Sequence, residues 1–271
     1  MANWLEPSAA REHVGGLIRH CRQQAGMTQR KLATETHVSE SLEGAYERGE
    51  RIPSAGFLID ADRCVVAGGV LESCVALMEK ESNRAKFQEW SLLEAEALSL
   101  GTYVTMVLPG LLQEPGYIRA LYKTRVYPYA PDEAARLVDE RLARQAVLVR
   151  EQPPNATFVV EEVAVKRPLG GSAVLKKALQ YLLDAVQAMD HVTLQVMPSV
   201  VESHAGLSGP LDMLFSPDGR RSIYLERQRE SALLTRPVDA ERYADMYSAI
   251  RAQALPPWKS LELIEKVAGE L

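Results

Sequence analysis

Between residues 26 and 53 the hydrophobic and polar positions follow the pattern of two short helices joined by a tight turn. Thr28 is a favourable N-cap for a helix over Gln29–Glu35, and Ser39 for a second helix over Glu40–Glu47, which Gly49 can end. Helices this short bury little surface by themselves. We therefore expect flanking helices, which the apolar spacing predicts over residues 16–24 and 57–66.

After a further expected helix at 71–78, the charged stretch Glu79–Lys86 is the predicted boundary between a domain of residues 1–80 and one of residues 81–271. Beyond it, helical and alternating patterns follow one another. The pattern predicts strands over 99–108, 157–165 and 192–197, and helices over 132–151, 172–189, 238–254 and 258–267.

A hairpin is predicted near the end of the chain, because Pro217-Asp218-Gly219-Arg220 separates two apolar strands over 211–216 and 222–226. The expected fold class is therefore α+β. An N-terminal all-α helix-turn-helix domain precedes a mixed α/β C-terminal domain.

The helical pair also carries a motif that resembles a known family, the repressor-type (XRE, lambda-repressor-like) helix-turn-helix proteins. The motif comprises Thr28, Gln29, Leu32, Ala33, Val38, Ser39, Glu47, Arg48, Gly49, Arg51, Pro53 and Ser54. The resemblance implies that the second helix enters the major groove of double-stranded DNA while the first rests on phosphates. The DNA-binding residues that it implies are Gln29, Arg30, Ser39, Glu40, Ser41, Gly44 and Arg48.

Three positions depart from the family pattern. His37 stands where the turn usually has glycine, and Glu43 stands where a buried Ile or Val is usual, followed by Gly44. A carboxylate at a core-facing position must stay solvated or disturb the packing. We therefore expect the second helix to rotate so that Leu42, Ala45 and Tyr46 become its buried face.

The charge balance is unusual for a DNA-binding domain. Residues 1–80 hold nine Lys or Arg and eleven Asp or Glu, which leaves −2, and the whole chain carries −5. Cations supply most non-specific affinity for DNA. A local basic side is nevertheless expected from Arg19, Arg22, Arg30, Lys31, Arg48 and Arg51, interrupted by Glu40, Glu43, Glu47 and Glu50.

The second half resembles the C-terminal domain of actinobacterial repressor-type regulators related to WhiJ, often described as antitoxin-like and of unknown function. The matching segments are 108–121 (LPGLLQEPGYIRAL), 141–145 (RLARQ), 162–171 (EVAVKRPLGG), 192–198 (VTLQVMP), 204–210 (HAGLSGP) and 223–226 (IYLE). The resemblance implies a transcriptional regulator whose C-terminal domain dimerises and contacts a small acidic partner protein or a small-molecule ligand. Asp212 departs from it, since an aromatic or aliphatic residue is usual there.

Candidate ligand-binding residues in this half are few. His204 lies in a glycine-rich loop between two strands, and Tyr117, Glu162 and Glu226 are expected to share a cleft with it. The alternative is a packed structural corner at Tyr117 and solvated glutamates at strand ends. No nucleophile triad, phosphate-binding loop or metal-spaced His/Cys cluster is present in the sequence, so we expect no catalytic residue, no cofactor and no metal.

Location and assembly follow from composition. The sequence has no apolar run of membrane-spanning length, no signal-peptide pattern at its start, and three cysteines without metal spacing, so we expect a cytoplasmic protein. We expect a homodimer because Trp258, Leu261, Leu263 and Ile264 form an apolar face on the last helix.

Three functions remain open. The first is a dimeric DNA-binding transcription regulator that receives a signal in its C-terminal domain. The second is an antitoxin-like interaction module that has lost DNA reading. The third is a regulator fold repurposed to bind or transform a small molecule in a biosynthetic pathway.

Overall fold

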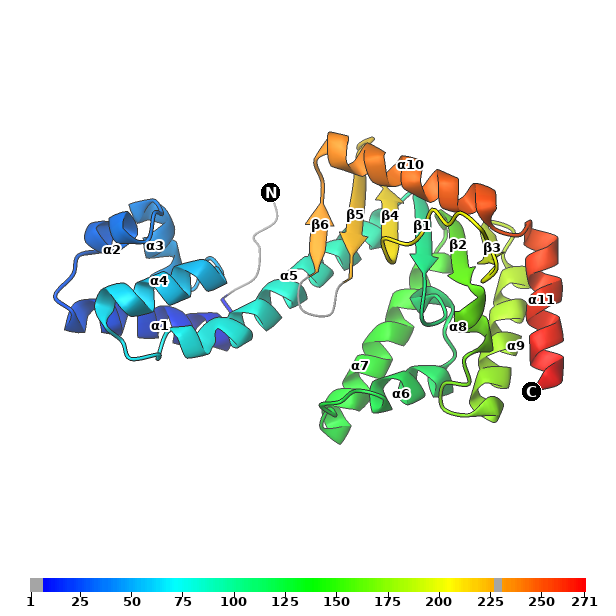
Figure 1. Ribbon diagram of the computed structural model, residues 1–271, viewed down its shortest axis with the longest axis horizontal. Coiled ribbons are helices and arrows are strands. Elements are labelled where there is room, and N and C mark those ends of the chain that lie inside the picture. The colour runs from blue at the N-terminus through cyan, green and yellow to red at the C-terminus, as the bar shows by residue number, and fades with distance from the viewer. Residues whose placement is uncertain (1–6, 227–230) are drawn as a thin grey trace. The chain divides into compact units, whose positions relative to one another are not determined.

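The computed structural model describes residues 7–226 and 231–271, which form two compact units, the first within residues 1–88 and the second mainly from residue 89 onward (Figure 1). The division falls inside a long helix, α5 (Val75–Glu96). The charged stretch 79–86, expected as a boundary segment, is therefore helical. Its Glu, Lys, Arg and Ala residues are good helix formers, and a charged surface is compatible with a helix.

The first unit consists of helices. These are α1 (Ala9–Gln24), α2 (Gln29–Glu35), α3 (Glu40–Glu47), α4 (Ala55–Val65), the short 3-10 helix η1 (Glu72–Cys74) and the first part of α5. The predicted bounds of α2 and α3 are confirmed, with Thr28 and Ser39 accepting the N–H groups of Lys31 (3.2 Å) and Leu42 (3.1 Å). α1 begins earlier than expected because Ser8 caps it.

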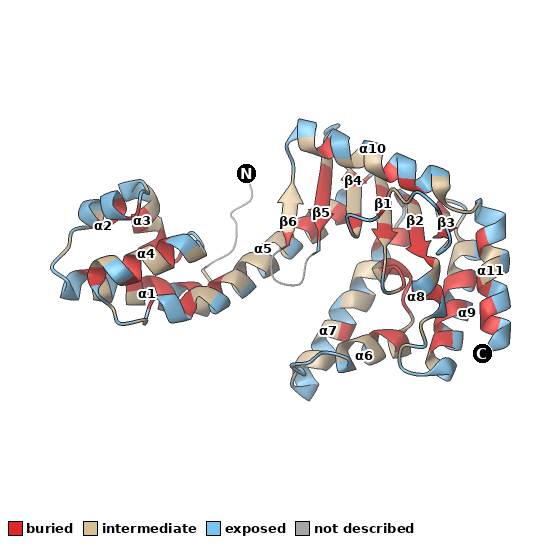
Figure 2. Cartoon of the chain, viewed as in Figure 1, coloured by how far each residue is buried: buried red, intermediate tan, exposed pale blue. Residues whose placement is uncertain are grey.

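The core of the first unit collects side chains from all of its helices, including Val14, Ile18, Leu32, Leu58 and Met78 (Figure 2). α1 and α3 cross at Gly15. A Cβ there would lie 2.5 Å from the Tyr46 carbonyl oxygen, so any larger residue would push the two helices apart. Glycine at this position therefore sets how deeply α3 is seated.

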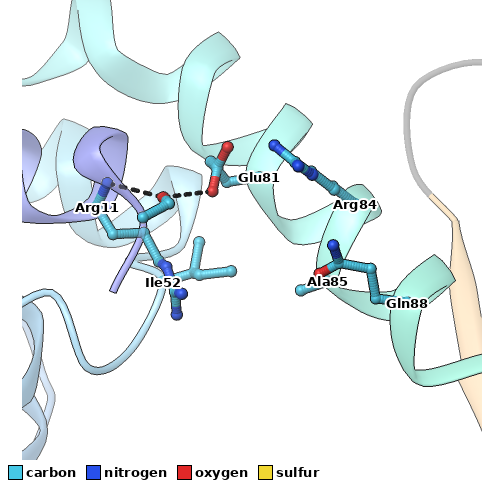
Figure 3. Close-up of a pocket in the computed structure, with 7 residues that line it drawn as sticks. Arg11, Ile52, Glu81, Arg84, Ala85 and Gln88 are labelled. Carbon is cyan, nitrogen blue, oxygen red and sulfur yellow. Dashed lines mark hydrogen bonds between the residues drawn. The ribbon is translucent and has the colours of Figure 1, made fainter. Parts of the chain in front are cut away.

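The start of α5 is attached to the start of α1 (Figure 3). The Ser8 hydroxyl accepts the Arg11 N–H at 3.3 Å and donates to the Glu81 carboxylate at 2.6 Å. Beside it lies a hollow of about 120 Å³, lined also by Ile52, Arg84 and Gln88. This hollow is smaller than the usual ligand pocket of about 300–1,000 Å³. It is a packing gap between two helices.

The second unit is built on one six-stranded sheet with the order β3-β2-β1-β4-β5-β6. β1, β2 and β3 run parallel, and the remaining neighbours are antiparallel. The strands are β1 (Ser99–Val104), β2 (Asn155–Glu161), β3 (Val192–Met197), β4 (Leu211–Phe215), β5 (Arg221–Leu225) and β6 (Ala232–Leu234). The predicted hairpin is confirmed, with β4 and β5 joined through Gly219 at a φ of 81°.

Helices cover both faces of this sheet. Along one face runs α10 (Pro237–Gln253), and the larger core lies under the other face (Figure 1). The remaining elements are η2 (Gly110–Leu112), α6 (Pro115–Lys123), α7 (Pro131–Arg144), η3 (Gln145–Leu148), α8 (Glu162–Lys166), α9 (Ser172–Ala188) and α11 (Pro257–Glu270). Overall the chain is α+β, as predicted from the sequence.

Two predicted strands end early. The expected strand 157–165 stops at Glu161, where α8 begins, and the expected strand 99–108 stops at Val104. β2 stops where its neighbour stops, because Glu161 pairs with Met197, the last residue of β3. An alternating pattern cannot remain a strand where no partner strand continues, since its backbone groups would be left unpaired.

The apolar face of the last helix is used inside the unit. Ile264 is fully buried in the larger core, and Leu261 and Leu263 pack against it. Only Trp258, which is 58% exposed, remains as a large apolar surface among the four residues expected to form a dimer face. The exposed apolar face on which the homodimer was predicted is therefore not present on α11.

Candidate functional site

The first turn of α3 and the outer side of α2 form an exposed surface on the first unit. Ser39, Glu40 and Ser41 are exposed at the start of α3, and Arg30 and Lys31 are exposed on α2. The Ser39 hydroxyl is occupied as the N-cap of α3. Glu40 and Ser41 are therefore the side chains in the first turn of α3 that are exposed and not used in capping.

Gly44 was expected to face the groove, but the structure buries it. A Cβ on Gly44 would lie 3.0 Å from Arg48 Nη1 and 3.8 Å from the Gln29 side-chain amide, so these two side chains cover it. Arg48 itself is exposed and makes a bidentate pair with Glu50 at 2.7 and 2.9 Å. The surface at this position thus belongs to Arg48 and Gln29.

The turn between α2 and α3 explains the usual glycine at position 37. His37 has a φ of 57°, in the left-handed region that is costly for residues with a side chain. Histidine adopts this region more readily than most residues. The turn therefore has the left-handed geometry that glycine adopts most easily, and His37 holds it at a conformational cost.

A buried ion pair fixes α3 to the rest of the first unit. Arg22 of α1 donates through Nε and Nη2 to the two carboxylate oxygens of Glu47, at 2.5 and 3.1 Å. Gln29 of α2 donates to the same carboxylate at 2.7 Å. Although burial opposes its ionisation, the hydrogen bonds from Arg22 and Gln29 lower the pKa of Glu47. One carboxylate therefore holds α1, α2 and α3 together.

The expected rotation of α3 to bury Leu42, Ala45 and Tyr46 is wrong: Tyr46 is buried, but Leu42 and Ala45 are only partly buried, and Glu43 lies inside instead of being solvated. The Glu43 side chain is 0% exposed and lies beside Glu47, with Arg22 Nε at 3.7 Å. Burial, reinforced by the negative charge of Glu47 beside it, raises the pKa of Glu43 to about 8. This shift favours the protonated form of Glu43, which can be buried at lower cost than a carboxylate.

This burial also changes the surface charge. Arg22, expected on the basic side, lies inside, and so do Glu43 and Glu47, which were expected to interrupt that side. The exposed cations on this part of the unit are Arg19, Arg30, Lys31, Arg48 and Arg51. Their surface is less acidic than the composition of residues 1–80 indicated.

In the second unit, His204 belongs to a buried hydrogen-bonded group at the end of β2. The Gly206 N–H donates to His204 Nδ1 at 2.9 Å, so Nε2 carries the proton and donates to the Glu161 carboxylate at 3.0 Å. The Tyr103 hydroxyl donates to the same oxygen at 2.5 Å. Burial, reinforced by the Glu161 carboxylate, raises the pKa of Tyr103. The sequence pattern missed Glu161 and Tyr103, because both sit in predicted strands.

The other three candidate ligand residues do not join His204. Tyr117 is fully buried in the core on the opposite face of the sheet, where its hydroxyl accepts the Leu108 N–H at 3.3 Å. Glu162 starts α8, pairs with Lys166 at 2.5 Å and accepts the Ser199 N–H at 2.8 Å. Its hydrogen bond with Lys166 lowers the pKa of Glu162. Glu226 is exposed at the end of β5. The predicted common cleft is not formed.

Asp212, which departs from the family pattern, lies in the middle of the sheet. Thr102 on the neighbouring strand donates its hydroxyl to the Asp212 carboxylate at 2.7 Å. Burial raises the pKa of Asp212 to about 6. Arg144 pairs with Glu94 nearby, with one bond at 3.0 Å.

The part of the chain that the structure describes contains neither a metal-binding cluster nor a membrane-spanning helix. Across residues 7–226 and 231–271, no group of three His, Cys, Asp or Glu residues is arranged to hold a metal ion. Within the same residues, no helix has the length and apolar character needed to cross a membrane.

Comparison with known families agrees with the division of the chain. Residues 13–72 match a helix-turn-helix domain, which indicates a DNA-binding regulator, and residues 87–266 match the Domain of unknown function (DUF5753). Neither a curated protein nor a solved structure matches the chain significantly. Since the second match covers most of its length, the chain belongs to the DUF5753 family, as a member that carries a helix-turn-helix domain before that domain.

Proposed function

We propose that this protein is a cytoplasmic, homodimeric transcription regulator that binds double-stranded DNA through α2 and α3 and receives a signal in its second unit. The observation that carries the proposal is the exposed first turn of α3, with Glu40 and Ser41, on a helix that Arg22 and Glu47 hold rigidly against α1. A helix presented in this way has the docking geometry of a recognition helix.

The roles of individual residues follow from this geometry. The proposed contacts to phosphate oxygens are Arg30 and Lys31, which are exposed on α2, joined by Arg48 once DNA competes with Glu50. Ser41 can bond to several bases, whereas Glu40 can accept only from cytosine N4. With Gly44 covered, few side chains read bases, so we expect modest specificity and a steep dependence on salt.

We propose dimerisation because of the affinity that DNA binding requires. A single small helix-turn-helix unit contacts few base pairs, and two half-sites one helical turn apart are the usual route to useful affinity. Light scattering at micromolar concentration gives twice the mass of one chain if the dimer forms without DNA.

The proposed cytoplasmic location rests on the cysteines. Cys21, Cys64 and Cys74 are free, which fits a reducing compartment.

Mobility shifts with the DNA upstream of the protein's own coding sequence test the proposal. We expect binding that falls steeply between about 50 and 200 mM salt. Arg30→Ala should weaken binding to specific and unrelated DNA alike and reduce the salt slope by about one. Ser41→Ala should instead narrow the difference between specific and unrelated DNA.

The matched control is Arg63→Ala, an exposed cation of α4 outside the helix pair, which should leave binding unchanged. Absence of a shift at low salt with the intact protein overturns the DNA-binding proposal. An effect of Arg63→Ala equal to that of Arg30→Ala overturns the assignment of α2 to the DNA backbone.

A further inference from the structure

The second unit has a hollow of about 360 Å³ between α10 and the sheet. It opens where β1 and β2 begin and is lined by Asn155, Thr157, Phe215, Arg221, Tyr247 and Arg251, among others. Its volume falls within the usual range of about 300–1,000 Å³ for small-molecule sites. It shares no residue with Tyr117, Glu162, His204 or Glu226.

The back wall of the hollow is rigid. Gly101 leaves room for the Tyr247 ring, since a Cβ there would lie 2.8 Å from Tyr247 Cε1. The buried Tyr247 hydroxyl donates to the Thr157 carbonyl oxygen at 2.7 Å and lies 3.0 Å from the Thr157 hydroxyl. α10 is therefore fixed to β2 at this point, and the hollow beside it is already formed without a ligand.

Two arginine side chains from different elements, Arg221 and Arg251, line the hollow. Arg221 of β5 lies 5.9 Å from the centre of the Phe215 ring and pairs with Glu241, in an ion pair that is partly exposed and therefore weak. Within residues 7–226 and 231–271, the one hydrogen bond of the Arg251 side chain on α10 is a long contact of 3.4 Å from Nε to Gln195 Oε1. Among the described residues, none of the ion pairs includes Arg251.

We propose that this hollow binds a small aromatic carboxylate. The flat apolar part lies against the side chains of Phe215, Met213 and Tyr247, and the carboxylate is held by the Arg251 guanidinium. Charge-assisted, bidentate bonds to a carboxylate are the strongest that an arginine side chain forms. The proposal deepens the proposed function, because it gives the signal received by the second unit a chemical class and a place.

Isothermal titration of the full-length protein with 2-naphthoate tests the site, with 2-naphthol as the uncharged counterpart of similar shape. We expect one 2-naphthoate bound per chain, with a dissociation constant below about 1 mM, and binding of 2-naphthol at least about tenfold weaker. Arg251→Gln should weaken 2-naphthoate binding about tenfold, the effect of losing one charge-assisted contact. Arg242→Gln, an exposed cation of α10 outside the hollow, should leave it unchanged.

A second variant tests the volume rather than the charge. Ala244 lines the hollow from α10, and Ala244→Leu should abolish binding of both compounds by filling it, while circular dichroism confirms that the chain remains folded. The site is overturned if 2-naphthoate shows no saturable binding, if 2-naphthol binds as tightly, or if Arg251→Gln and Arg242→Gln behave alike. Because no DNA is present, failure here leaves the DNA-binding proposal to its own mobility-shift test.

Discussion

Glu47 of the first unit and Glu161 of the second are both buried among hydrogen-bond donors, but their charges are compensated in different ways. In the first unit, Glu47 is paired with the buried cation Arg22, and a second acid, Glu43, lies alongside. In the second unit, Glu161 accepts from the neutral donors Tyr103 and His204. No Lys or Arg among the described residues forms an ion pair with Glu161.

The difference matters because the two arrangements lose stability differently. Removing one partner of a buried ion pair leaves an uncompensated charge in a low-dielectric interior. Removing one neutral donor leaves the carboxylate with its other donors and costs about one hydrogen bond. The helix pair proposed to bind DNA therefore depends mainly on one buried cation, Arg22, because the other cation at Glu47, Arg19, is half exposed. The loop that carries His204 is instead held by hydrogen bonds from neutral donors.

The strongest test of this comparison is Arg22→Met. We expect the free energy of unfolding of the first unit to fall by about 3–5 kcal/mol, because Glu47 is left buried without its cation. Hydrogen exchange of the full chain, read on the amides of α3, measures the change locally. Arg19→Met is the matched control, since Arg19 touches the same carboxylate at 3.4 Å with its side chain half exposed, and it should cost less than about 1 kcal/mol.

Equal effects of the two variants would show that Glu47 does not depend on a buried cation, and the contrast between the units would be lost. A large effect of Arg22→Met confined to the first unit would support it. The amides of β1 to β3 in the second unit provide the internal reference, because these strands contain neither residue.

A smaller effect is expected from Tyr103→Phe in the second unit. The substitution keeps the buried ring and removes only the hydroxyl that donates to Glu161, so the cost should be about 1–3 kcal/mol. Exchange of the amides at 198–210, the segment that carries His204, is the measurement. A loss as large as that from Arg22→Met would mean that Glu161 also lacks adequate alternative donors.

The third expectation concerns the slope of stability against pH, which is the smallest effect per step of the measurement. The pKa of Glu43 is about 8 in the folded unit and near 4.5 without its surroundings, so between these values the folded unit binds more protons than the unfolded chain. Its stability should therefore fall as pH rises through this window, by at most about 1.4 kcal/mol per pH unit. Glu47 has a lowered pKa, so its contribution is lost only in acid, below its ordinary value.

Hydrogen exchange of α3 between about pH 6 and pH 8, corrected for the intrinsic pH dependence of exchange, measures this slope. Glu43→Gln retains the shape of the protonated acid and cannot ionise, so it should flatten the slope. A slope that survives in Glu43→Gln would assign the pH dependence to another group and leave Glu43 without a role in it.

The helix pair shows which features can be predicted from residues that are close together in the sequence. α2 and α3 begin at the predicted residues because Thr28 and Ser39 cap them through contacts three residues away, and α3 ends before Gly49, which has a φ of 71°. The hairpin at Gly219 is similar, since its turn needs only neighbouring residues. Elements whose ends depend on a distant partner were predicted less well, as at Glu161, where β2 ends with its neighbour β3.

The candidate site divides in the same way. The exposed residues at the start of α3 could be recognised from the motif alone. The covering of Gly44 by Arg48 and Gln29 could not, because it depends on side chains from two helices. The expected cleft of Tyr117 and His204 failed for a related reason, since the two lie on opposite faces of one sheet and strand order cannot be read from spacing.

The sequence by itself determined the helix-turn-helix motif, the α+β class and the hairpin at Gly219, because caps, turns and periodicity act over a few residues. Only the tertiary structure decided that Glu43 is buried beside Arg22, that Glu161 rather than Glu162 holds His204, and that α10 leaves a hollow beside Gly101. These features depend on which side chains meet across the fold. The pKa of a buried acid and the shape of a cavity both depend on contacts between side chains that are distant in the sequence. Desolvation sets the pKa, and packing sets the shape of the cavity.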